Sequence, residues 1–166
     1  MTMKPSQASQ SNALLLDGWI EGGAHNYLLR VQYEDTDLGG IIYHANYLKF
    51  AERARSSYLR CLGIFQDEDV RAGGHAFVVR RVEIDFRKAA GLGVTLCVST
   101  NTIKLSRLRL TLDQTIKNHE TGLILAGVVV DIVYVCVDGK GEVVPARMPN
   151  EMMDCLTGNH QDHDEK

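Results

Sequence analysis

All three prolines of this 166-residue chain, Pro5, Pro145 and Pro149, lie outside residues 6–144. Proline interrupts helices and the hydrogen-bond ladders of sheets, so the long middle of the chain is free to form uninterrupted elements. A chain of this length suggests one domain, with a core that needs no disulfide or metal to hold it. The sequence therefore predicts a few long elements.

Alternation of apolar and charged residues predicts that most of these elements are strands. In residues 75–88, Val82, Ile84 and Phe86 face one way, while charged side chains occupy the positions between them. The apolar run 123–137 predicts a long strand that is buried on both faces for much of its length. The other predicted strands span residues 26–33, 94–104 and 107–117.

A single helix is predicted over residues 46–62, because apolar side chains recur there at helical spacing. One strand, one helix and then four strands form an order typical of an α+β fold, with an antiparallel sheet packed on the helix. We expect this domain to span residues 23–156. The polar segments 1–22 and 157–166 are expected to be flexible tails.

Composition narrows the class of protein and its compartment. The formal net charge of -3 argues against a broad nucleic-acid-binding surface. The apolar run 123–137 contains Asp131 and is too short for a membrane span, and residues 13–16 are too short for a signal peptide. The four cysteines form no CxxC pair and fit small buried residues in a reducing compartment. We therefore expect a cytoplasmic protein.

Asp35 and Asp37 lie between the first predicted strand and the helix, and Gly39 and Gly40 follow them. A carboxylate there is close to the positive end of the helix dipole and to first-turn amides that have no intrahelical partner. A base or nucleophile beside such donors suits attack on a carbonyl, with the oxyanion held by backbone N–H groups. The same residues would also make an ordinary capping loop, and the residues alone favour that simpler interpretation.

An ordered set of motifs along the chain bears on the choice between these two interpretations. The segments are Arg30-Val31, Thr36-Asp37, Gly40-Ile41-Ile42-Tyr43-His44, Asn46-Tyr47, Glu52-Arg53-Ala54-Arg55, Ala76-Phe77-Val78-Val79-Arg80-Arg81, Val135-Cys136-Val137-Asp138-Gly139 and Pro145-Ala146-Arg147-Met148-Pro149. Over roughly residues 26–150 this set resembles the 4-hydroxybenzoyl-CoA thioesterase family. The segments 34–37 and 43–47 are most similar to its YbgC-type branch, which is linked to the Tol-Pal cluster.

This resemblance implies a hotdog fold, in which an antiparallel five-stranded sheet wraps a long central helix. It implies hydrolysis of an acyl-CoA thioester to a free acid and coenzyme A, without a metal or redox cofactor. Asp37 would be the nucleophile or the general base, and the backbone amide of His44 would polarise the thioester carbonyl. The His44 side chain is itself a catalytic candidate. The family works as homodimers or homotetramers with active sites at the subunit interface.

Substrate contacts follow from the same resemblance. Tyr43 and Tyr47 are candidates to line the acyl pocket, although packing in the core explains them equally well. Coenzyme A carries phosphates and needs a few cations, for which the resemblance indicates Lys104, Arg107 and Arg109. Solvation of an exposed strand face would explain these three cations nearly as well.

Two other functions stay open at this point. A hotdog protein without catalytic activity would bind acyl-CoA or act as a scaffold, because a fold alone does not fix function. A hotdog dehydratase or hydratase would need a different arrangement of His and acid, which this sequence lacks. The presence of Asp37 with the whole glycine turn favours the hydrolase. The identity of the acyl group is not readable, since the pocket depends on side chains from two subunits.

Overall fold

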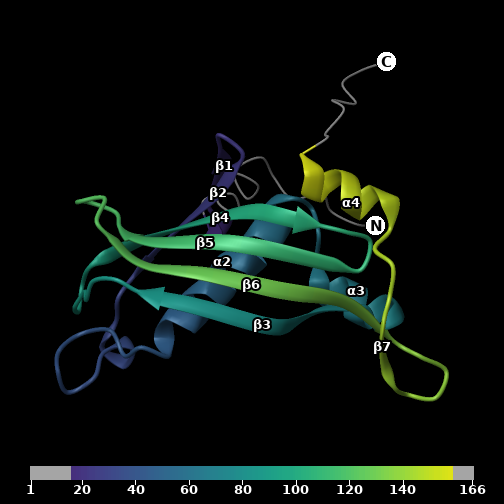
Figure 1. The fold of residues 1–166 in the computed structure, drawn as a ribbon, viewed down its shortest axis with the longest axis horizontal. Coiled ribbons are helices and arrows are strands. Elements are labelled where there is room, and N and C mark those ends of the chain that lie inside the picture. Colours follow the sequence, from purple (N-terminus) through teal and green to yellow (C-terminus); the bar gives the residue numbers. More distant parts are fainter. Residues whose placement is uncertain (1–15, 159–166) are drawn as a thin grey trace, which may run out of the picture.

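The computed structural model describes residues 16–158, and Figure 1 shows one long helix lying across one face of a sheet. In chain order the elements are β1 (Trp19–Glu21), β2 (Ala24–Arg30), a 3-10 turn η1 (Tyr33–Asp35), α2 (Asn46–Cys61), α3 (Gln66–Gly73), β3 (Ala76–Phe86), β4 (Thr95–Leu105), β5 (Arg109–Asn118), β6 (Ile124–Val137), β7 (Val143–Pro145) and α4 (Asn150–Thr157). The predicted helix and the five predicted strands are all present, as α2 and as β2 to β6. The first predicted strand ends early, at Arg30, because Tyr33 already begins η1.

The sheet has seven strands in the described residues, so the predicted number of five is wrong. The two additional strands, β1 and β7, have three residues each, which is too short for alternation to reveal them. β1 lies within the expected N-terminal tail 1–22 and pairs with β2, so that tail does not extend to residue 22. At the other end, Thr157 closes α4. The expected tail residues 1–15 and 159–166 lie outside the described part of the chain.

The strand order is β1-β2-β4-β5-β6-β3, with β7 also paired to β6. Every pairing is antiparallel. β3 therefore forms one edge of the sheet, and in the described residues its long outer side pairs with no other strand. An unpaired edge of this length is a ready template for another strand.

The core lies between α2 and the sheet. Phe50, Ala51 and Ala54 of α2 are fully buried against the helix-facing side chains of the strands. A polar network crosses this interface, since Nη1 of Arg55 donates to Oε1 of Gln114 at 2.8 Å. Nε2 of Gln114 in turn donates to the carbonyl of Ala51, and the network holds the helix at one position on the sheet.

The prediction that β6 is buried on both faces is wrong for the chain as described. Val128 and Val130 face α2 and are fully buried, whereas Val129 and Asp131 face away from it and are half-buried. The sheet thus has one face covered by α2 and one open face. No helix within residues 16–158 is long and apolar enough to span a membrane.

Candidate active site

The loop between β2 and α2 is folded into a tight hairpin that carries Asp37. Thr36 and Ile42 form an antiparallel bridge, and the backbone N–H of Asp37 donates to the carbonyl of Ile41 at 3.0 Å. Gly40 turns the chain with a φ of 74°, a left-handed conformation that glycine adopts without steric cost. The hairpin therefore has a defined shape, and it leads directly into the first turn of α2.

The carboxylate of Asp37 is exposed and available. Its Oδ1 accepts a hydrogen bond from the backbone N–H of Gly39 at 2.8 Å. Within residues 16–158 no cation lies within ion-pair distance of it. Asp35 differs, because it is buried and its Oδ2 accepts the backbone N–H of Gln32 at 2.8 Å. Asp35 thus stabilises the base of the loop, and Asp37 is the carboxylate that can meet a substrate.

The N-terminus of α2 is left without a side-chain cap. The N-cap residue is Ala45, and the first turn carries no acidic residue. Asn46, which could have capped the helix, instead donates from Nδ2 to the carbonyl of Glu34 at 3.3 Å. Among the described residues the backbone N–H of His44 finds no acceptor. An uncapped helix of 16 residues presents a positive end with free donors at this point.

The His44 ring borders a shallow groove. It contacts the Tyr43 ring at 4.5 Å between centroids and lies edge-on to Phe86 at 6.4 Å. The groove has a volume of about 270 Å³ and is lined by Ile41, Ile42, His44, Tyr47, Phe86, Arg87, Lys88 and Ala89. Tyr47 is buried, which raises the pKa of its phenol, so it packs in the core and lines the groove at once. Tyr43 is exposed and does not line it.

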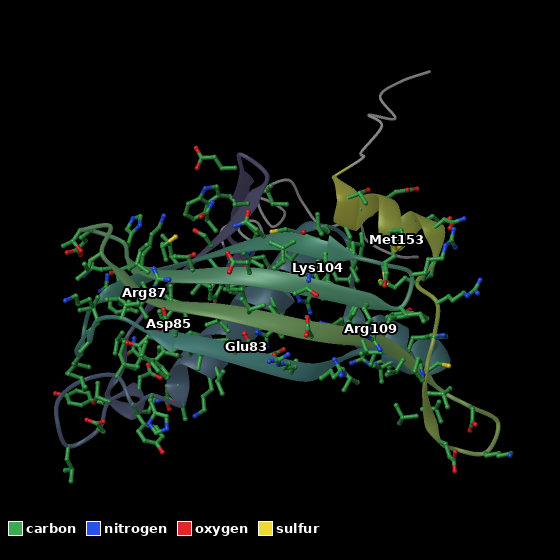
Figure 2. All side chains as sticks on the ribbon, viewed as in Figure 1. Glu83, Asp85, Arg87, Lys104, Arg109 and Met153 are labelled. Carbon is green, nitrogen blue, oxygen red and sulfur yellow. The ribbon has the colours of Figure 1, made fainter. Side chains whose placement is uncertain are left out.

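The predicted cations lie elsewhere in the chain. Lys104 and Arg109 line a second groove on the open face of the sheet, together with Arg80 and Asp131. Figure 2 shows Arg87, beside the first groove, at one end of the sheet and Lys104 and Arg109 toward the other. Arg107 is exposed in the β4–β5 turn and lines neither groove. One chain therefore does not bring the predicted nucleotide contacts to Asp37.

The sequence interpretation missed Phe86, Arg87 and Lys88 as neighbours of the site. Phe86 is the last residue of β3, and Arg87 and Lys88 follow it. They reach the Asp37 loop because the N–H of Ile42 donates to the carbonyl of Ala90 at 2.8 Å. Alternation with Val82 and Ile84 placed Phe86 on the helix side of β3 but gave no sign of this pairing. Among the side chains that the structure describes, no group of three or more His, Cys, Asp or Glu could hold a metal ion.

Comparison with known proteins places this geometry in a family. Residues 39–125 match the thioesterase superfamily. The acyl-CoA thioesterase YbgC of Haemophilus influenzae is 38% identical over 127 residues, which cover 76% of this chain and 90% of the relative. The family match begins at Gly39 in the glycine turn and spans α2, β3, β4 and β5.

Solved structures agree on the fold. A probable thioesterase from Bartonella henselae superimposes with a TM-score of 0.67 at 33% identity, covering 76% of this chain and 99% of that one. A 4-hydroxybenzoyl-CoA thioesterase mutant in complex with 4-hydroxybenzoyl-CoA gives a TM-score of 0.74 at 15% identity, covering 81% and 99%, and this likeness shows the fold alone. The fold is thus that of the hotdog thioesterases, as predicted. The chain belongs to the thioesterase superfamily, and within it the chain is similar to the YbgC proteins.

Proposed function

We propose that the protein hydrolyses acyl-CoA thioesters to a free carboxylic acid and coenzyme A, with Asp37 as nucleophile or general base. One observation carries the proposal. The Asp37 carboxylate, which has a hydrogen bond from Gly39 but no cation beside it among the described residues, lies in a hairpin that leads directly to the uncapped N-terminus of α2. A negative group and free N–H donors at one place suit attack on a carbonyl carbon and stabilisation of the oxyanion that forms.

The chemistry needs few groups. As a nucleophile, Asp37 adds to the thioester carbonyl. The C–S bond then breaks, the thiolate of coenzyme A departs, and the acyl group remains bound to Asp37 as a mixed anhydride. Water then cleaves that anhydride and regenerates the carboxylate. As a general base, Asp37 instead removes a proton from the water that attacks. In both routes the His44 N–H is the proposed oxyanion donor, and the His44 imidazole is the candidate to protonate the leaving thiolate.

A complete site requires a second copy of the chain. Lys104, Arg107 and Arg109 are the proposed contacts for the phosphates of coenzyme A. Within one chain, Lys104 and Arg109 line the second groove and lie away from Arg87, which borders the groove beside the Asp37 hairpin (Figure 2). Among the side chains that the structure describes, the cations that line the second groove, Arg80 included, have no ion-pair partner. Unpaired cations are available to phosphates. We infer a homodimer, or a tetramer built from it, in which each site uses both copies.

The free edge of β3 is the proposed dimer contact. Arg81 and Glu83 lie on the open face and are both exposed, with an ion pair between them inside one chain. If two copies pair antiparallel with the two-fold axis at Val82, Arg81 of each copy lies opposite Glu83 of the other, which gives two such pairs. A centre at Glu83 would also pair Arg81 with an acid, Asp85, but it would place the two Glu83 carboxylates directly opposite each other, which destabilises a strand pair. The charges therefore favour the register centred on Val82.

The compartment belongs to the same proposal. Cys61, Cys97, Cys136 and Cys155 are all free thiols. Free thiols suit the reducing cytoplasm, where acyl-CoA substrates are used. The acyl-CoA substrate is the partner that the site requires, and no nucleic acid or resident cofactor enters the proposed reaction.

The test is release of free thiol from a panel of acyl-CoAs, running from short aliphatic to long-chain and aromatic thioesters. Asp37→Asn should abolish release while the far-ultraviolet circular dichroism spectrum is kept. Glu120→Gln, which removes a carboxylate from the exposed β5–β6 turn, is the matched control and should keep full activity. Binding of acyl-CoA without thiol release by the native protein would favour the non-catalytic function. Addition of water to an enoyl-CoA would favour the hydratase.

A further inference from the structure

We infer that Phe86 determines acyl specificity, by forming the wall that limits the size of the acyl group next to the thioester. This inference rests on the proposed thioesterase function and deepens it. Phe86 ends β3, and its side chain is 49% exposed although it points to the helix side of the sheet. An aromatic ring that is half open to solvent in a groove is a typical ligand contact.

The ring of Phe86 faces the two groups that the proposed reaction places closest to the acyl chain. It meets the Tyr47 ring edge-on at 5.4 Å between centroids, and the His44 ring at 6.4 Å. These three rings, with Ile41 and Ile42, form the apolar part of the 270 Å³ groove. If the His44 N–H holds the thioester carbonyl, the acyl chain extends along this apolar part of the groove.

The wall is held rigidly relative to the hairpin. The backbone N–H of Ile42 donates to the carbonyl of Ala90 at 2.8 Å, and Ile41 forms a bridge with Gly91. On the other side, the N–H of Arg87 donates to the carbonyl of Leu125 at 2.8 Å. The backbone at Phe86 is therefore held between the sheet and the hairpin and does not move as part of a free loop. A fixed wall discriminates by size, because a longer acyl group meets it as a clash.

The cationic rim of the groove fits an acyl chain that lies along its apolar part. Arg87 and Lys88 follow Phe86 and are exposed, and Arg87 is paired with Asp85 through Nε at 3.0 Å. The apolar wall therefore lies toward His44, and the polar rim lies toward solvent. The apolar side of the groove suits an uncharged acyl chain, and the cationic rim suits the polar part of the substrate.

The experiment measures kcat/KM for a homologous series of acyl-CoAs with the native protein, Phe86→Ala and Phe86→Leu. The expected result is that Phe86→Ala moves the optimum to longer acyl groups, and that native discrimination of about tenfold per added methylene falls toward none. Phe86→Leu should give an intermediate profile. Phe65→Ala, which removes a comparably exposed ring near α3, should leave the native profile unchanged.

A second readout separates this inference from the proposed function. Dissociation constants of non-hydrolysable thioether analogues of the same acyl-CoAs are measured for each variant, together with its oligomeric state. If the native protein releases no thiol, the proposed hydrolysis fails, and the dependence of these constants on chain length still decides the role of Phe86. An unchanged chain-length dependence in Phe86→Ala would overturn the inference. Loss of the dimer with an unchanged profile would do so too, since Phe86 would then be an interface residue.

Discussion

Arg55 of α2 and Gln114 of β5 share a buried hydrogen bond of 2.8 Å between the helix and the sheet. Gln114 is fully buried, and Arg55 keeps 7% of its surface exposed. Gln114 has two further bonds, from Nε2 to the Ala51 carbonyl and to Oγ1 of Thr100, both at 3.0 Å. This glutamine therefore links the helix to two strands at once.

Gln114→Ala should lower the free energy of unfolding by about 3 kcal/mol, because it leaves a buried guanidinium and a backbone carbonyl short of partners. Urea denaturation measures the change. Lys140→Ala, in an exposed turn, is the control and should stay within about 0.5 kcal/mol of the native protein. A Gln114→Ala protein as stable as this control would show that the network does not hold the helix.

Gly39→Ala should reduce kcat by about tenfold with little change in stability. A Cβ at residue 39 would meet Oδ1 of Asp37 at 3.1 Å, so the carboxylate has to shift. Gly139→Ala is the matched control, since a Cβ there meets nothing within 4 Å. Steady-state kinetics with the best acyl-CoA, and a thermal melt, separate the two effects. Equal kinetics for both variants would mean that the position of Asp37 is not critical.

Stability should fall as the pH drops below about 6.5, through His25. This ring is fully buried, and its Nε2 is 2.7 Å from the Asp17 carbonyl, while its Nδ1 has no hydrogen-bond partner among the described residues. Burial lowers the pKa of His25 below its ordinary value. Between the folded and the unfolded pKa the unfolded chain binds more protons, so acid favours unfolding, by up to about 1.4 kcal/mol per pH unit.

Urea denaturation at pH 8 and at pH 5.5 measures this contribution. His25→Gln removes the titrating group, so part of the loss between the two pH values should disappear. His119→Gln, in the exposed β5–β6 turn, should keep the native dependence. A pH dependence that is the same in all three proteins would assign the effect to other groups.

Exchanging charges on β3 tests the proposed dimer. Arg81→Glu should raise the monomer fraction, because two like charges would then face each other in the register centred on Val82. The double variant Arg81→Glu with Glu83→Arg should restore the dimer. Lys140→Glu, in an exposed turn, is the control. Light scattering over a dilution series gives the mass, and a double variant that stays monomeric would reject this register.

The long elements were predictable because each carries a complete pattern. β3 alternates charged and apolar residues from Arg81 to Phe86, and α2 repeats its apolar face several times. α3 was missed because its sequence is almost entirely polar, with little apolar face to detect. β1 and β7 were missed because three residues contain too little of a period. These short elements are defined by pairing with partners that are distant in the sequence.

The candidate site was predictable on one side only. The motif around Asp37 and His44 is local, and the structure places it in the hairpin that enters α2. The wall made by Phe86 and the two residues after it depends on the backbone pairing of Ile42 with Ala90. Such a contact between distant segments leaves no mark in local periodicity. The separation of Lys104 and Arg109 from Asp37 has the same origin.

The pairing of Ile42 with Ala90 joins two segments with different tasks. The hairpin that carries Asp37 performs the proposed bond cleavage, and the segment after β3 only borders the groove. A substitution in the second segment can therefore alter which substrate is accepted without disturbing the reacting groups. A duplicated copy of this gene would have an evolutionary route to a new substrate that keeps the reaction active at every step.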